Sequence, residues 1–131
     1  MFAKRVVTVA AAIASIAALG TVTAPGASAA GQDGVAESEE FIFFYNSNYG
    51  GSYSDFASNK PDLAGYTFLR QGLNGYGQAV KNNSASVYNN RTQAARVYFN
   101  SGYAGAVDQV PGMSGRNLTL TYNENASFRW I

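Results

Sequence analysis

The chain has 131 residues, a formal net charge of +1, no cysteine and no histidine. These absences exclude disulfides, thiolate and imidazole zinc sites, and the Ser-His-Asp and Cys-His catalytic systems. A near-neutral charge provides no long-range attraction to nucleic acid or to an anionic membrane, so we expect neither as a partner. The eight acidic residues are scattered without a catalytic pairing, and we therefore predict a protein that is not an enzyme.

Residues 1–29 have the organisation of a secretory signal peptide. Lys4 and Arg5 precede an uncharged apolar run, and the small residues Ala27-Ser28-Ala29 stand directly before the predicted cleavage site. A retained membrane anchor is the alternative that this pattern leaves open. After cleavage, seven basic residues remain against eight acidic ones, a net charge of −1. We expect a secreted, extracellular protein that has no membrane association after cleavage.

The mature chain divides into a short leader and one domain. Residues 30–40 are rich in Gly, Ala and acidic residues without an apolar period, so we predict a flexible leader there. From residue 41 onward, Tyr, Phe and Val alternate with Gly, Asn and Ser, which is typical of short strands joined by turns. The predicted strands are 41–46, 51–53, 65–69, 85–88, 95–100, 104–107, 118–122 and 127–131. Loops are expected at 54–64, 70–84 and 108–117, and the fold class is all-β.

Two segments of the domain recur in the same order. The pattern aromatic-x-Asn-x-x-Tyr-x-Gly occurs at residues 44–51 and again at 98–105. The pattern Asn-x-x-Ala-Ser-apolar occurs at 82–87 and again at 123–128. The two offsets are 54 and 41 residues, so the first half carries an insertion, most easily placed in the Gly-rich stretch 70–77.

Each repeated residue type has a physical reason to occur where it does. Gly51 and Gly105 stand where a strand that folds back needs a positive φ angle. The tyrosine two positions earlier can pack over the folded hairpin, and the late serine can tie the hairpin backbone to a crossing strand. The predicted structural residues are Phe44, Tyr49, Gly51, Tyr98, Tyr103 and Gly105.

This repeat resembles the βγ-crystallin Greek-key motif, two of which form one domain. More closely, the chain is similar to the bacterial secreted proteins of peptidase inhibitor family I36, through residues 44–51, Gly75-Tyr76-Gly77 with 80–86, and 98–105. The resemblance implies a βγ-crystallin-like sandwich over 41–131, with motif one at 41–88 and motif two at 95–131. It also implies an inhibitor of extracellular peptidases, characteristically metallopeptidases. Family members commonly carry cysteines, one of them near Ile42, and this chain has none.

An inhibitor of this kind acts by docking an exposed loop that stays ordered once bound. The inhibitory loop candidates are Asn59, Lys60 and Pro61, because many endopeptidases cut the bond before a proline poorly. Residues 108–116 form a second candidate loop. We expect a monomer whose partner is an extracellular peptidase. The alternative is a non-inhibitory, βγ-crystallin-like structural or weakly calcium-binding extracellular protein.

The βγ-crystallin fold often binds calcium through the motif Asn/Asp-Asn/Asp-x-x-Ser/Thr-Ser. The corresponding segments are 81–86 and 122–127, in which Lys81 and Tyr122 occupy the first position and Ala85 and Ala126 the fifth. Each segment thus lacks two side-chain oxygens, although calcium prefers six to eight oxygen ligands. The remaining candidate ligands are Asn82, Ser86, Asn123, Glu124 and Ser127. We expect no cofactor, with calcium as the less favoured possibility.

Overall fold

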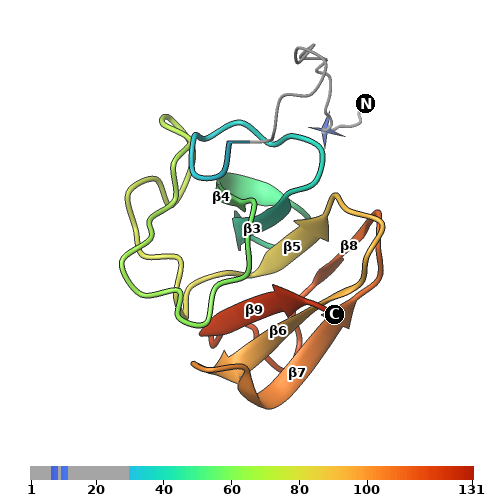
Figure 1. Cartoon of the computed structure of the whole chain (residues 1–131). Coiled ribbons are helices and arrows are strands. Elements are labelled where there is room, and N and C mark those ends of the chain that lie inside the picture. Colours follow the sequence, from blue (N-terminus) through green and yellow to red (C-terminus); the bar gives the residue numbers. More distant parts are fainter. Residues whose placement is uncertain (1–6, 9, 12–29) are drawn as a thin grey trace.

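The computed structural model describes residues 7–8, 10–11 and 30–131 (Figure 1). Strands β1 (Val7–Thr8) and β2 (Ala10–Ala11) pair with each other in parallel. The rest of the predicted signal peptide lies outside the described residues. Within residues 7–8, 10–11 and 30–131, no helix is long and apolar enough to cross a membrane.

Seven antiparallel strands in two sheets form the domain, which confirms the all-β fold class. The first sheet has the order β4 (Gly50–Phe56), β3 (Phe41–Asn46), β5 (Ser86–Asn89) and β8 (Ser114–Asn117). The second has the order β7 (Ala104–Val110), β6 (Ala95–Asn100) and β9 (Ser127–Trp130). The two sheets pack with their inner faces together (Figure 1).

Each half of the chain contributes one segment to the sheet of the other half. Strand β8 follows β7 in the chain but pairs with β5 of the first sheet. Lys60 follows β4 and makes an antiparallel bridge to Phe128 of β9, in the second sheet. The chain is therefore a sandwich of two interlocked Greek-key motifs, and their hairpins have matching registers 54 residues apart, Asn46 opposite Gly50 and Asn100 opposite Ala104.

Two of the predicted strands are wrong. Residues 118–122 do not form a strand, because the carboxylate of Asp108 accepts the backbone N–H groups of Thr119, Leu120 and Thr121. The strand lies instead at 114–117, inside an expected loop, because the free edge of β5 pairs with it despite its weak β propensity. Residues 65–69 contribute only an isolated bridge from Thr67 to Ala79.

Aromatic rings from both motifs make the centre of the core. Phe41 and Phe43 point inward from β3, in keeping with the two-residue period of a strand, and both are fully buried. Phe41 stacks on Phe128 of β9 with ring centroids 4.6 Å apart, and Phe128 meets Phe56 edge to face at 5.7 Å. The core thus joins the two sheets directly, without disulfides.

Residues 30–40 are attached to the domain, which corrects the expectation of a flexible leader. The Gln32 N–H donates to the Asp55 carbonyl at 2.8 Å, and the Gly34 N–H donates to Asp55 Oδ1 at 2.8 Å. At the other end, Asn90 N–H donates to the Glu40 carbonyl at 2.9 Å. The composition did not indicate this order because polar contacts, rather than burial of a periodic apolar face, hold the segment.

Candidate functional site

The two repeated hairpins are closed by serine hydroxyls in the same way. Ser86 Oγ donates to the Asn46 carbonyl at 2.7 Å and accepts the Tyr49 N–H at 2.9 Å. In the second motif, Ser127 Oγ makes the same pair of contacts, to the Asn100 carbonyl at 2.7 Å and from the Tyr103 N–H at 3.1 Å. Both serines lie on crossing strands. Ser86 and Ser127, proposed from the sequence as calcium ligands, thus have structural partners.

The other repeated residues complete the hairpins. Gly51 and Gly105 have φ angles of 74° and 84°, in the left-handed region that favours glycine. Aromatic pairs cover both folds: Phe44 lies 5.7 Å from Tyr49, and Tyr98 lies 5.7 Å from Tyr103, measured between ring centroids. These six residues thus complete the folds of the two hairpins.

An open pocket lies where the first hairpin meets the two Asn-rich segments. Its lining residues are Tyr45, Asn46, Ser47, Asn83, Ala85, Tyr122 and Asn123. Tyr122 stands at position one of the calcium-motif segment 122–127, and Ala85 stands at position five of the segment 81–86. The lining of the pocket includes no carboxylate. These residues offer neutral amide and hydroxyl oxygens but no side-chain charge to balance a calcium ion.

The other calcium-motif segment, residues 81–86, has Lys81 at its first position, where the segment 122–127 has Tyr122. Lys81 Nζ donates to Ser101 Oγ at 3.1 Å, and Ser101 corresponds to Ser47 of the first pocket. The same ammonium donates to Asp62 Oδ1 at 2.9 Å. A side-chain cation therefore supplies positive charge near the second hairpin, which disfavours a calcium ion there as well.

The remaining predicted ligands tie the two segments to each other. Asn82 N–H donates to the Asn125 carbonyl at 2.8 Å, and Asn123 N–H donates to the Ser84 carbonyl at 2.9 Å. The buried amide of Asn125 donates to the Val80 carbonyl and to Ser84 Oγ. Glu124 is exposed. These contacts give Asn82 and Asn123 a role in holding the Greek keys together.

The segment predicted as an inhibitory loop is paired with the second sheet. Lys60 exchanges both backbone hydrogen bonds with Phe128, each 3.0 Å long. Asn59 Oδ1 accepts the Trp130 N–H at 3.0 Å, and the Pro61 carbonyl accepts the Gly102 N–H at 2.7 Å. The backbone of Lys60 and the Pro61 carbonyl are thus engaged with the second motif. Residues 108–116 are also mostly in strands, the end of β7 and the start of β8.

A different segment, residues 70–78, presents apolar side chains on an ordered backbone. The side chains of Leu73 and Tyr76 are 47% and 51% exposed. The backbone of this segment is anchored at two points, since Ser52 N–H donates to the Asn74 carbonyl at 2.8 Å and Gly77 N–H donates to the Phe68 carbonyl at 2.9 Å. The sequence indicated an insertion and a Gly-rich loop here, but it could not show that these two side chains point outward.

Two interlocked Greek-key motifs with serine-tied hairpins define this protein as a βγ-crystallin-type domain. It is similar to a structure from work on the evolution of the eye-lens βγ-crystallin domain fold, with a TM-score of 0.58 and 14% identity over 75% of this chain and 93% of the other. It is also similar to the N-terminal domain of protein S, with a TM-score of 0.53 and 25% identity over 70% of this chain and 94% of the other. An archaeal βγ-crystallin matches with a TM-score of 0.51 and 20% identity over 72% of this chain and 100% of the other.

A family model narrows this class. The model of peptidase inhibitor family I36 matches residues 29–110, and the chain belongs to this family. A search of curated proteins found no match. Membership in an inhibitor family indicates that the protein is not an enzyme and that its partner is a peptidase.

Proposed function

We propose that this protein is a secreted inhibitor of extracellular metallopeptidases, and that it docks the loop formed by residues 70–78. The inhibitor role rests on the family match, which spans 29–110 and includes the whole of this loop. The metallopeptidase class and the extracellular setting rest on the resemblance to family I36 and on the predicted signal peptide.

The observation that supports this loop is the exposure of Leu73 and Tyr76 on a backbone that is anchored on both sides. Buried Ser52 fixes the start of the loop, because its hydroxyl donates to the Arg70 carbonyl and accepts the Arg70 N–H, both at 2.9 Å. A loop that is already ordered loses little conformational entropy on docking, and exposed apolar side chains can fill a peptidase subsite. Anchoring by hydrogen bonds takes the place that disulfides have in other family members.

Titration of the purified protein against a thermolysin-like metallopeptidase tests the proposal. We expect inhibition at micromolar protein or below, weakened at least tenfold in Leu73→Ala or Tyr76→Ala, about 1.4 kcal/mol of binding free energy. Leu120→Ala is the matched control, because Leu120 is 61% exposed but lies outside the family match. This control should inhibit like the wild type.

Two results would contradict different parts of the proposal. If the wild-type protein leaves the peptidase active and is cut within 70–78, the inhibitor role against this enzyme class is wrong. In that case the chain behaves as a βγ-crystallin-like structural protein. If the wild type inhibits but both loop variants inhibit equally well, the role stands and the assignment of the loop is wrong.

A further inference from the structure

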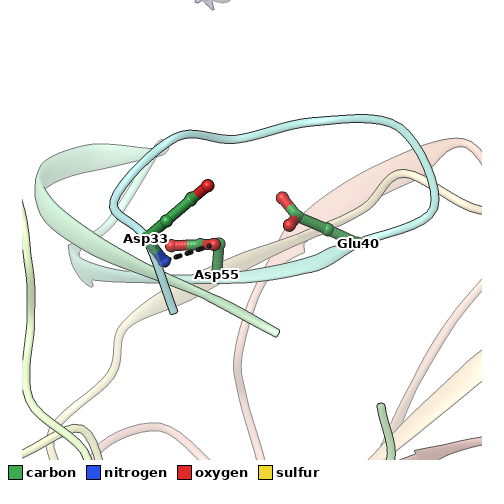
Figure 2. Close-up of side chains that lie close together, drawn as sticks. All are labelled: Asp33, Glu40 and Asp55. Carbon is green, nitrogen blue, oxygen red and sulfur yellow. Dashed lines mark hydrogen bonds between the residues drawn. The ribbon is translucent and has the colours of Figure 1, made fainter. Parts of the chain in front are cut away.

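Three carboxylates converge beside the first sheet, far from the crystallin-type calcium motif in the sequence. Asp33 comes from the attached segment 30–40, Glu40 stands directly before β3, and Asp55 lies on β4. One carboxylate oxygen from each residue lies within 4.8 Å of those from the other two. Figure 2 shows the Asp33 and Asp55 side chains close together and the Glu40 side chain reaching toward them across the loop.

The hydrogen bonds leave part of this cluster unused. Asp55 Oδ1 accepts the Gly34 N–H at 2.8 Å, and Asp55 Oδ2 accepts the Asp33 N–H at 3.2 Å (Figure 2). Glu40 Oε1 accepts the Glu37 N–H at 2.8 Å. Glu40 is fully buried, and its Oε2 atom has no hydrogen-bond partner among the described residues. A buried oxygen of this kind normally has a partner.

The charges of the cluster are also uncompensated. None of the ion pairs among residues 30–131 includes Asp33, Glu40 or Asp55. Burial, with the neighbouring Asp55 charge added, raises the pKa of Glu40 to about 10. Burial also raises the pKa of Asp55 to about 7, although backbone hydrogen bonds from Gly34 and Asp33 oppose the shift. A positive charge beside Glu40 and Asp55 would favour the ionised form of both groups.

We propose that Asp33, Glu40 and Asp55 form a binding site for a hard divalent cation, of which calcium is the best match. Calcium takes carboxylate oxygens in flexible geometry, and water completes its coordination. The free Glu40 Oε2 would be one ligand, and exposed Asp33 leaves an entry path for the ion. The site would attach segment 30–40 to β4 more firmly. It is separate from the crystallin-type position, where Lys81, Tyr122 and two alanines replace the ligands.

Thermal unfolding with calcium tests this site in the protein purified after expression of the full chain. An ion bound only by the native state raises the melting temperature. With about 10 mM Ca²⁺ and a dissociation constant of about 1 mM or below, as in extracellular modules, we expect a rise of about 5 °C or more over the same protein in EDTA. Sodium chloride matched for ionic strength should give no such rise.

Variants then locate the ion. Glu40→Gln keeps the shape of the side chain and removes its charge. Asp33→Asn changes a ligand at an exposed position, so this variant should fold even if Glu40→Gln does not. Each should abolish the rise. Glu124→Gln, which removes the only carboxylate of the crystallin-type motif, should retain it.

Two outcomes overturn the proposal. If the wild-type melting temperature is the same in calcium and in EDTA, the cluster is neutralised by protons instead of a cation. If Glu124→Gln loses the rise while Asp33→Asn keeps it, the ion binds at the crystallin-type position. Neither outcome depends on peptidase inhibition.

Discussion

Asp108 binds residues 119–121, within the segment 118–122 that the sequence predicted as a strand. Its Oδ2 accepts the Thr119 N–H at 3.0 Å, the Thr121 N–H at 2.9 Å and the Thr121 hydroxyl at 2.6 Å. Its Oδ1 accepts the Thr119 hydroxyl at 2.8 Å and the Leu120 N–H at 3.3 Å, and Arg116 Nη2 lies 3.3 Å away. Asp108 is only 2% exposed, so water does not substitute for these donors. The ionised carboxylate is thus a structural element of the second motif.

The substitution Asp108→Asn should lower the stability of the protein by about 2 kcal/mol at pH 7. Burial by itself raises the pKa of Asp108, but hydrogen bonds from Thr121 and Thr119 outweigh it and lower this pKa to about 2. A shift of nearly two units corresponds to about 2.5 kcal/mol of preference for the ionised form in the folded state. Asparagine also turns an N–H group toward donors that need an acceptor.

The sign of the pH dependence follows from the direction of this shift. Because the pKa of Asp108 is lower in the folded state than in the unfolded state, its contribution is fully present above about pH 4. It is lost as the pH falls toward the folded-state pKa of about 2. The wild type and Asp108→Asn should therefore differ most near neutral pH and approach each other in acid.

Urea unfolding at pH 7 and at about pH 2.5, followed by the fluorescence of Trp130, measures both effects. Trp130 is the single tryptophan and is buried against Phe128, so its emission reports loss of the core. Asp62→Asn is the control, since Asp62 is exposed and paired only with Lys81 and the nearby loop, and it should unfold close to the wild type. Equal stability of Asp108→Asn and the wild type at pH 7, or an unchanged difference in acid, would refute this reasoning.

Three further substitutions test the hairpin ties and the buried polar centre. Ser86→Ala leaves a hairpin N–H and a carbonyl without their partner and should cost about 1–3 kcal/mol in urea unfolding, with Ser127→Ala similar because its contacts match. Asn89→Ala should cost about 2–4 kcal/mol and shift the Trp130 emission to longer wavelength, since Asn89 Oδ1 accepts the indole N–H at 3.0 Å. Unchanged emission in a folded Asn89→Ala variant would contradict that contact.

The hairpins of both motifs could be predicted from the sequence because their geometry is local. A strand that folds back within eight residues requires a positive φ at Gly51 and Gly105, and the same side chains recur wherever that requirement recurs. The repeat therefore predicted both hairpins and supported the all-β fold class. The serine ties were also predictable in kind, since Ser86 and Ser127 recur at a fixed place in the pattern.

The candidate sites depended on contacts that no local pattern contains. The acidic segment 30–40 has the composition of a disordered leader, and only β4 brings Asp55 beside Asp33 and Glu40. In the same way, Lys60 lies in a stretch with turn-forming residues, but its backbone makes an antiparallel bridge to Phe128 at the edge of β9.

By itself, the sequence determined the class of fold, the two hairpins and the serines that close them, because positive φ angles, aromatic packing and short-range hydrogen bonds act over a few residues. The tertiary structure alone decided which segments cross between the sheets, that Lys60 pairs with β9 while Leu73 and Tyr76 are exposed, and that three carboxylates meet. Those outcomes depend on edges and buried groups supplied by residues far away in the chain.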